Sequence, residues 1–239
     1  MPGGTTLQAG EIHRVWDIFL LTATAIIVTV YVLIFWSIAV YRRRGEGLPP
    51  QFHDDLPWEV GLTLLPLLIV TGLFVLTYRA EVRIEHVAAD PPVQIRVTGF
   101  EWSWRFEYAG GGPTVTGTPE QPPVLVLPVH QPVRIDITSS DVDHAFFVPA
   151  FLFKRDAIPG FVSSFQWDLS EPGTYRGECA EFCGLDHAAM NFTVSVRSRQ
   201  AFADWLRRAR AAHPGPATAL PPGGRPATRG GALAGPAVR

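Results

Sequence analysis

Residues 178–190 read Glu178-Cys179-Ala180-Glu181-Phe182-Cys183-Gly184-Leu185-Asp186-His187-Ala188-Ala189-Met190 and hold both cysteines of the 239-residue chain. Within this segment Cys179, Cys183, His187 and Met190 follow one another at intervals of four, four and three residues. Two thiols, an imidazole and a thioether therefore fall in one short turn. Soft sulfur and nitrogen donors of this kind suit copper. The segment predicts a metal-binding loop around which the rest of the chain is organised.

A disulfide and a zinc site are the alternatives to copper in this loop. Two cysteines four residues apart in an exported domain are more often a structural disulfide than a metal site. A tetrahedral zinc site would use Cys179, Cys183, His187 and one distant histidine, and it would give Met190 no role. The additional donors favour a metal over a disulfide, and Met190 favours copper over zinc.

The distant histidine is expected to be His144, because it opens an apolar, strand-like segment, Ala145-Phe146-Phe147-Val148, rather than lying on a polar tail. Two thiolates, two imidazoles, one thioether and one backbone carbonyl are more donors than a single copper ion takes. If both sulfurs bridge, two copper ions share them.

Three stretches together resemble subunit II of the haem-copper cytochrome c oxidases. They are the His144 segment, the Cys-x-Glu-x-Cys-x-x-x-His-x-x-Met run, and Gly99-Phe100-Glu101-Trp102-Ser103-Trp104. The resemblance extends from about Trp16 to about Arg199. It implies a dinuclear copper centre, called CuA, on a cupredoxin fold. It also implies that the chain accepts electrons from cytochrome c and passes them to haem in subunit I, where oxygen is reduced and protons are pumped.

The resemblance also implies the roles of individual residues at the copper centre. The expected ligands are two bridging thiolates, two terminal imidazoles and two weak axial donors: Cys179 and Cys183, His144 and His187, and Met190 with the backbone carbonyl of Glu181. Asp141 and Asp186 are candidates for orienting the imidazoles through hydrogen bonds.

Two further roles follow from the same resemblance. The side chain of Glu181 is expected to bind a magnesium ion that is shared with subunit I. Trp102 takes the position at which electrons enter from cytochrome c. No residue of this chain is expected to take part in oxygen chemistry, so catalytic residues are expected only on another subunit.

The N-terminal part of the chain predicts a membrane anchor. Ile18 to Tyr41 contains no charged residue and is long enough to cross a bilayer as a helix. A second apolar run, Val60 to Tyr78, contains Pro66, which membrane helices tolerate. Arg42, Arg43 and Arg44 follow the first run, so the positive-inside rule places them in the cytoplasm and the N-terminus outside. We expect residues 1–88 to form an N-terminal segment and a two-helix transmembrane hairpin with spans at about 18–41 and 60–78.

Glu59 stands at the start of the second apolar run. A carboxylate at a helix N-terminus is favoured by the helix dipole, and this alone would explain the residue. In the family, a glutamate at the same distance before the second-span proline lies at the mouth of a proton-uptake path into subunit I. The resemblance therefore implies that Glu59 marks the entrance of a proton path.

Beyond Glu81 the sequence consists of short alternating or apolar segments, which are typical of strands. The clearest of them are residues 93–97, 124–127, 133–138 and 192–196. Residues 102–108 alternate aromatic and polar side chains, which predicts a strand with one aromatic face. We expect a mainly β protein in which residues 89–200 form a cupredoxin-like β-sandwich or barrel.

The C-terminal part is expected to contain a short helix and a disordered tail. Residues 198–211 place Phe202, Trp205 and Leu206 on one side of a helix. Residues 213–239 are rich in Pro, Gly and Ala and contain no acidic residue, a composition that cannot bury enough apolar surface to order itself. We expect residues 201–239 to comprise most of this helix and the tail.

Composition excludes some functions and suggests partners. A formal net charge of −2 gives no basic footprint for nucleic acid. The absence of a Cys-x-x-Cys-His sequence excludes a covalently attached c-type haem. Twelve acidic and eight basic residues lie between positions 92 and 200, an excess that would steer a basic cytochrome c.

The expected setting is a bacterial plasma membrane, with the N-terminus and the β domain on the outer face and with subunits I and III as partners. Alternative functions are the equivalent subunit of a copper-dependent nitric oxide reductase, or a membrane-anchored copper carrier. Quinol oxidase relatives lack the copper ligands that this chain has. A redox titration separates a carrier from an electron-transfer subunit.

Overall fold

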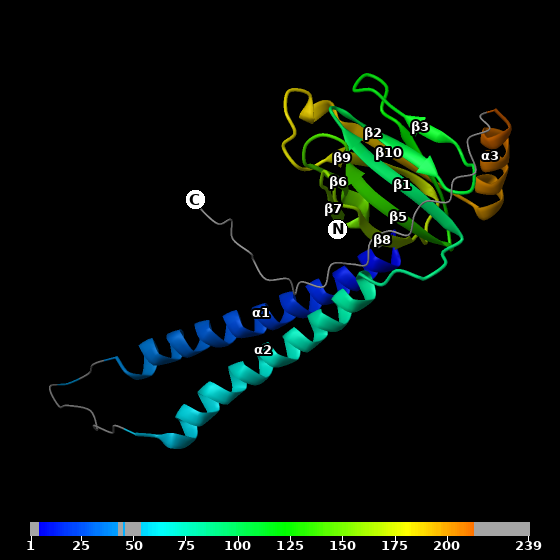
Figure 1. Ribbon diagram of the computed structural model, residues 1–239. Helices are drawn as coiled ribbons and strands as arrows, with labels where there is room; N and C mark the ends of the chain where they lie inside the picture. Colours follow the sequence, from blue (N-terminus) through cyan, green and yellow to red (C-terminus); the bar gives the residue numbers. More distant parts are fainter. Residues whose placement is uncertain (1–4, 43–44, 46–53, 213–239) are drawn as a thin grey trace, which may run out of the picture. The chain divides into compact units, whose positions relative to one another are not determined.

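The computed structural model describes residues 5–42, 45 and 54–212 (Figure 1). These residues belong to two compact units: the chain up to Gly10 together with the chain from Ile84 onward, and Glu11–Arg83. The predicted tail at 213–239, and Arg43 and Arg44 of the predicted cytoplasmic cluster, lie outside the described residues.

Two long apolar helices, α1 (Leu7–Val40) and α2 (Leu56–Ile84), account for the predicted membrane spans. Both are long and apolar enough to cross a membrane, and their most apolar windows are not buried inside the protein. A helix that is apolar on all sides needs lipid or protein around it. Both helices begin before the predicted spans, because a helix can continue into polar residues beyond its apolar run.

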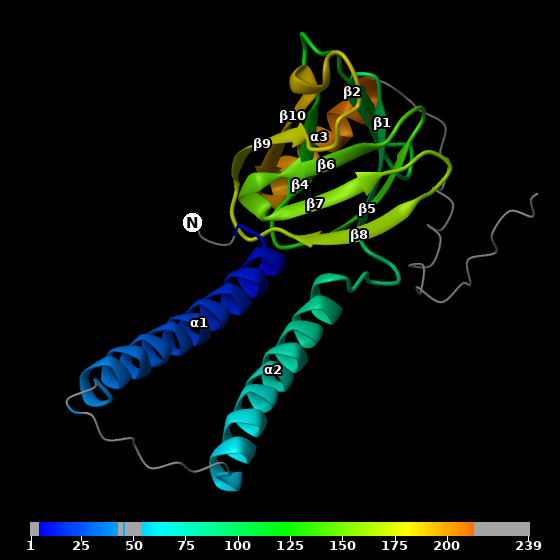
Figure 2. The same ribbon diagram turned by 90° about the vertical axis from the view of Figure 1, so that its left-hand side faces the viewer.

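Ten strands within the described residues form two five-stranded sheets that face each other (Figure 1 and Figure 2). The first sheet has the order β3-β2-β1-β5-β8 and the second β4-β10-β9-β6-β7. The pairs β1/β5 and β4/β10 are parallel and the others antiparallel. The strands are β1 (Val93–Phe100), β2 (Ser103–Tyr108), β3 (Thr114–Thr116), β4 (Val124–Pro128), β5 (Pro132–Ser139), β6 (His144–Val148), β7 (Phe153–Ala157), β8 (Ser163–Asp168), β9 (Gly173–Cys179) and β10 (Asn191–Arg197).

The predicted mainly β class and the cupredoxin-like sandwich are confirmed, as are the four clearest predicted strands. The aromatic strand is confirmed in part, because β2 begins at Ser103 and Trp102 lies in the turn between β1 and β2. The aromatic side chains that follow on β2 are buried and form core rather than surface.

Aromatic side chains from both sheets form the centre of the core. Phe146 on β6 stacks on Phe192 of β10 with ring centroids 4.2 Å apart, and Trp104 of β2 meets Phe146 edge-on at 5.2 Å. The hydroxyl of Tyr108, on β2, donates to the carbonyl of Val126 and accepts from its N–H, at 3.0 and 2.8 Å. Val126 lies on the edge strand β4, so a side chain from one sheet satisfies free backbone groups of the other.

Both ends of the described chain pack on the sandwich. The helix α3 (Arg199–Ala212) buries Phe202 against the core, as its sequence pattern predicts. At the other end, the Thr5 hydroxyl donates to the Ala150 carbonyl at 2.7 Å, and Thr6 pairs with Leu169 as an isolated β-bridge. Residues 5–10, which lie before the first predicted span, are therefore part of the β unit.

Candidate metal centre

The predicted donor residues come from three elements that meet at one end of the sandwich. His144 is the first residue of β6, and Cys179 is the last residue of β9. The antiparallel pairing of β6 with β9 sets Phe146 opposite Cys179, which brings the start of β6 next to the end of β9. The remaining donors lie in the loop between β9 and β10, coloured yellow in Figure 1, which contains the short helix η2 (His187–Ala189).

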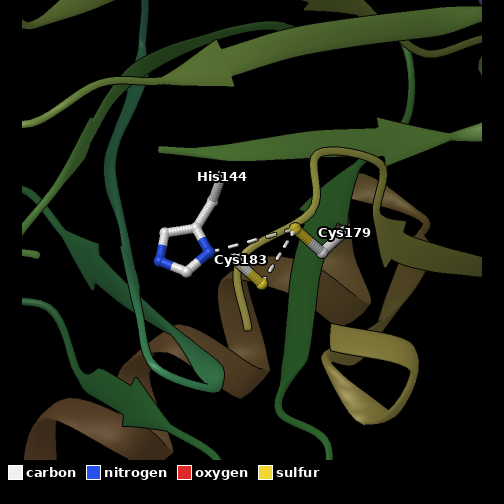
Figure 3. A group of neighbouring side chains, drawn as sticks. All are labelled: His144, Cys179 and Cys183. Carbon is white, nitrogen blue, oxygen red and sulfur yellow. Dashed lines mark hydrogen bonds between the residues drawn. The ribbon is translucent and has the colours of Figure 1, made fainter. Parts of the chain in front are cut away.

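Figure 3 shows the centre of the site, where the side chains of His144, Cys179 and Cys183 converge. Their ligand atoms all lie within 4.8 Å of one another, and all three residues are buried. The two sulfurs are 3.9 Å apart, whereas bonded sulfurs lie about 2.05 Å apart. Both cysteines are free thiols, so no disulfide joins them.

The other predicted donors surround the same pair of sulfurs. The Nδ1 atom of His187 lies 3.5 Å from the Cys183 sulfur, and the Met190 sulfur lies 3.7 Å from it. The backbone carbonyl of Glu181 lies 3.3 Å from the Cys179 sulfur. Three sulfur atoms, two imidazoles and one carbonyl oxygen are thus gathered in one place.

Asp141 fixes the orientation of the His144 ring. Its carboxylate lies 2.9 Å from Nε2 of His144, while Nδ1 of the same ring faces the Cys179 sulfur at 3.9 Å. The carboxylate also accepts from the backbone N–H groups of Glu101 and Val142, at 2.8 and 2.7 Å. Burial raises the pKa of Asp141, but these hydrogen bonds outweigh burial and lower it. An ionised Asp141 therefore leaves Nδ1 of His144 free to bind a metal.

Asp186, the other residue predicted to orient an imidazole, does not do so. Its side chain makes no hydrogen bond to His187 within the part of the chain that the structure describes. Instead, the Asp186 carbonyl accepts from the N–H of Ala189 and helps to form η2. Of the two predicted aspartates, only Asp141 supports an imidazole.

The two thiols differ in acidity because their surroundings differ. Burial raises the pKa of Cys183, and the nearby Cys179 sulfur raises it further. Burial also raises the pKa of Cys179, but hydrogen bonds with His144 and with the backbone of Ala145 and Glu181 lower it to about 7. Two thiolates 3.9 Å apart repel each other, so both ionise only when a cation stands beside them.

The donor set fits copper. Thiolate and thioether ligands select soft metals such as copper, and imidazole suits it as well. A tetrahedral zinc ion would use the two thiolates and two imidazoles and would leave the buried Met190 sulfur, 3.7 Å from Cys183, without a role.

Trp102 and Glu181 flank the donor set. The indole N–H of Trp102 donates to the backbone carbonyl of Cys183 at 2.9 Å, so the residue predicted to receive electrons touches the ligand loop. The Glu181 side chain pairs with Lys154 at 3.3 Å. Lys154 also pairs with Asp156 at 3.4 Å.

Glu59 is not part of this site. It lies in the first turn of α2, in the other unit, and its carboxylate accepts from the N–H of Asp55 at 3.4 Å. This is the contact expected of a carboxylate at a helix N-terminus.

Two glycines of the site were not predicted. A Cβ atom at Gly99 would lie 2.9 Å from Cδ2 of His144, and a Cβ atom at Gly184 would lie 3.1 Å from the indole nitrogen of Trp102. The contact at Gly99 is closer than Cβ atoms come in proteins, and the contact at Gly184 is tight enough that its neighbour would have to shift by a few tenths of an ångström. The absence of a side chain at these positions therefore allows the two rings to lie where they do.

The family model for the periplasmic domain of cytochrome c oxidase subunit II matches residues 120–197. A probable cytochrome c oxidase subunit 2 from Streptomyces coelicolor is 36% identical over 87% of this chain and 77% of its own length. The cytochrome c oxidase subunit 2 of Mycobacterium tuberculosis is 31% identical over 87% of this chain and 74% of its own length.

Among solved structures, the periplasmic domain of subunit II of the Bradyrhizobium japonicum cytochrome oxidase is 30% identical. The match covers 53% of this chain and 99% of that domain, with a TM-score of 0.48. Five further relatives, each at least 30% identical over at least 74% of its own length, are named cytochrome c oxidase subunit 2 or probable cytochrome c oxidase subunit 2. The chain belongs to the cytochrome c oxidase subunit II family.

Proposed function

We propose that this chain is the electron-input subunit of a cytochrome c oxidase. It takes electrons from cytochrome c at a dinuclear copper centre and passes them to haem in subunit I, where oxygen is reduced and protons are pumped. The observation that carries this proposal is the convergence of six donor groups of the kinds that copper prefers around one pair of buried, unbonded cysteine sulfurs.

In this proposal the copper ions would be held by six donors: the thiolates of Cys179 and Cys183, the imidazoles of His144 and His187, the Met190 thioether and the Glu181 carbonyl. When bound, a copper pair of this kind supplies one-electron transfer in which the charge change is spread over two metals and two sulfurs. The protein holds the donors in position so that little has to move. Asp141 keeps the His144 ring in one orientation, and burial of His144, Cys179 and Cys183 excludes water.

Trp102 is the proposed contact for cytochrome c, because its ring is partly exposed and its N–H touches the ligand loop. Two exposed carboxylates lie nearby in the sequence: Glu101 precedes Trp102, and Asp143 precedes His144. Together with the acidic excess of the domain, these carboxylates would attract a basic donor over long range at low salt.

We further propose that α1 and α2 anchor the chain in a bacterial plasma membrane beside subunits I and III, with the β unit on the outer face. The bonding of Thr5 and Thr6 to the β unit supports an N-terminus on that same side. The Glu181 carboxylate would bind magnesium shared with subunit I by exchanging its Lys154 partner for the ion. Glu59 would lie at the entrance of a proton path in the assembled complex.

The experiment is a redox titration of the copper-loaded full chain in detergent, followed by rapid mixing with reduced cytochrome c at several salt concentrations. The proposal predicts reversible one-electron reduction and a rate that falls as ionic strength rises. Cys183→Ser should lose the shared-copper signal and the reactivity together. A chain that holds copper but does not cycle reversibly would be a copper carrier, and the proposal would be wrong.

A further inference from the structure

The indole ring of Trp102 is held against the ligand loop at a position where the chain has no side chain. Gly184 follows the ligand Cys183 directly and adopts a φ of +115°, a conformation that residues with a side chain rarely adopt. A Cβ atom there would lie 3.1 Å from Nε1 and 3.2 Å from Cζ2 of Trp102. Any side chain at position 184 would therefore push the indole away from the loop.

The backbone next to Trp102 is also held in place. The N–H of Glu101, the residue before Trp102, donates to the Asp141 carboxylate at 2.8 Å, and Asp141 also holds His144. The backbone beside Trp102 is thus tied to one predicted copper ligand, and its ring is tied to another through the carbonyl of Cys183. Because the backbone is held in this way, the turn cannot shift as a whole to preserve the hydrogen bond to Cys183 when the ring is displaced.

We propose that Gly184 is a positioning residue for electron transfer: by lacking a side chain, it lets the Trp102 indole donate its N–H to the Cys183 carbonyl and so couples the two electronically. This inference rests on the proposed function, because it assumes that electrons enter at Trp102. It adds a residue whose role is to set the contact between the receiving ring and the ligand loop.

This contact matters because it gives electrons a continuous path of hydrogen and covalent bonds from the Trp102 ring to the Cys183 sulfur. From the indole nitrogen, a hydrogen bond of 2.9 Å leads to the Cys183 carbonyl, and covalent bonds through Cα and Cβ of the same residue lead to its sulfur. Tunnelling through bonds and short hydrogen bonds is far more efficient than tunnelling across a gap. One electron crosses, the indole keeps its proton, and no covalent bond forms or breaks.

The size of the effect follows from the size of the displacement. Contacts of 3.1 and 3.2 Å must open by a few tenths of an ångström to reach an ordinary van der Waals separation, and the 2.9 Å hydrogen bond beside them would lengthen and weaken. Since misplacement of reacting groups by about 1 Å can cost about a hundredfold in rate, a displacement of a few tenths of an ångström should slow electron input in Gly184→Ala by roughly three- to fivefold.

The test uses the full chain, assembled in the oxidase, with Gly184→Ala and a matched control. Gly160 also has a positive φ, +73°, but no atom lies within 4 Å of its added Cβ, so Gly160→Ala adds a side chain to a positive-φ backbone without the contact. Copper content, the copper spectrum and the rate of copper reduction by reduced cytochrome c are measured for both. We expect normal copper content in both variants and slow reduction of the copper only in Gly184→Ala.

A double-mutant cycle tests whether Gly184→Ala slows electron input through the Trp102 ring. In a Trp102→Ala background, Gly184→Ala should cause no further slowing, because there is no ring left to displace. Equal slowing in the two backgrounds, loss of copper from Gly184→Ala, or a wild-type rate in Gly184→Ala would each overturn the inference.

A separate readout distinguishes this inference from the function on which it rests. If Trp102→Ala reacts at the wild-type rate, electrons enter elsewhere, and both the assignment of Trp102 and the coupling role of Gly184 fail. If Trp102→Ala is slow, the indole N–H resonance of Trp102 in the copper-reduced protein tests the positioning directly. Gly184→Ala should shift this resonance and speed its hydrogen exchange. An unchanged resonance would show that Gly184 does not position the ring.

Discussion

Asp141→Asn is predicted to weaken copper binding by loosening the His144 ring. The wild-type carboxylate holds Nε2 of His144 at 2.9 Å and accepts from the N–H groups of Glu101 and Val142 at 2.8 and 2.7 Å. Asparagine has nearly the same shape but carries no charge, and it offers one acceptor oxygen in place of two. The substitution therefore keeps the packing and removes the charge-assisted hydrogen bonds.

The expected magnitude follows from the role of such contacts. Loss of a hydrogen bond that orients a ligating histidine typically lowers metal affinity about ten- to a hundredfold, which corresponds to about 1.4–2.7 kcal/mol. His144 is completely buried, so its ring has no water to replace the lost partner. We therefore expect the effect to lie toward the upper part of this range.

The assay is competition between the copper-loaded full chain in detergent and a copper chelator, followed by the visible absorbance of the site. Asp143→Asn is the matched control, since Asp143 is exposed, lies one residue from His144 and makes no side-chain hydrogen bond or ion pair within the described residues. Copper loss from Asp141→Asn at a lower chelator concentration than from Asp143→Asn would support the reasoning. Equal retention by the two variants would refute it.

Three further predictions concern stability and packing. Tyr108→Phe should lower the free energy of unfolding by about 1–3 kcal/mol, because the buried N–H and C=O of Val126 lose the hydroxyl, and denaturant unfolding of the full chain measures this. Burial raises the pKa of Tyr108 above its ordinary value near 10, so its neutral hydroxyl contributes stability that is fully present below about pH 10 and is lost as the pH rises further. The free energy of unfolding should therefore fall more steeply above pH 10 for the wild type than for Tyr108→Phe, which retains only the smaller contribution of the other tyrosines; parallel pH profiles would contradict this. Gly99→Ala should destabilise the site by about 1–3 kcal/mol and reduce copper content, because its Cβ would lie 2.9 Å from the His144 ring, whereas Gly10→Ala, with open space around it, should bind copper normally. Removal of copper by a chelator should lower the thermal unfolding midpoint, since the ligands bind the metal only when folded, and an unchanged midpoint would show that the metal does not bind at the folded site.

The group of donor residues could be predicted because most of it is local in the sequence. The donors from Cys179 to Met190 lie in one short loop, so their types and spacing indicate the chemistry directly. His144 could be added because it opens an apolar strand, and the structure brings it beside Cys179 through the pairing of β6 with β9. Strand periods and apolar runs likewise predicted the sandwich and the two long helices.

The parts that were not predicted depend on contacts between distant residues. The hydrogen bond from Trp102 to Cys183 joins residues 81 positions apart, and the bond from Glu101 to Asp141 joins residues 40 positions apart. No local pattern encodes such pairs. The same holds for Thr5, which bonds to Ala150 across 145 positions and makes the N-terminal segment part of the β unit.

Copper stoichiometry together with electron paramagnetic resonance of the copper-loaded full chain tests whether Cys179 and Cys183 share two copper ions. We expect two copper ions per chain and a spectrum in which one unpaired electron is shared equally between them, with the sharing lost in Cys183→Ser. One localised copper ion per chain, or zinc alone bound with comparable affinity, would contradict a dinuclear electron-transfer centre built on Cys179 and Cys183.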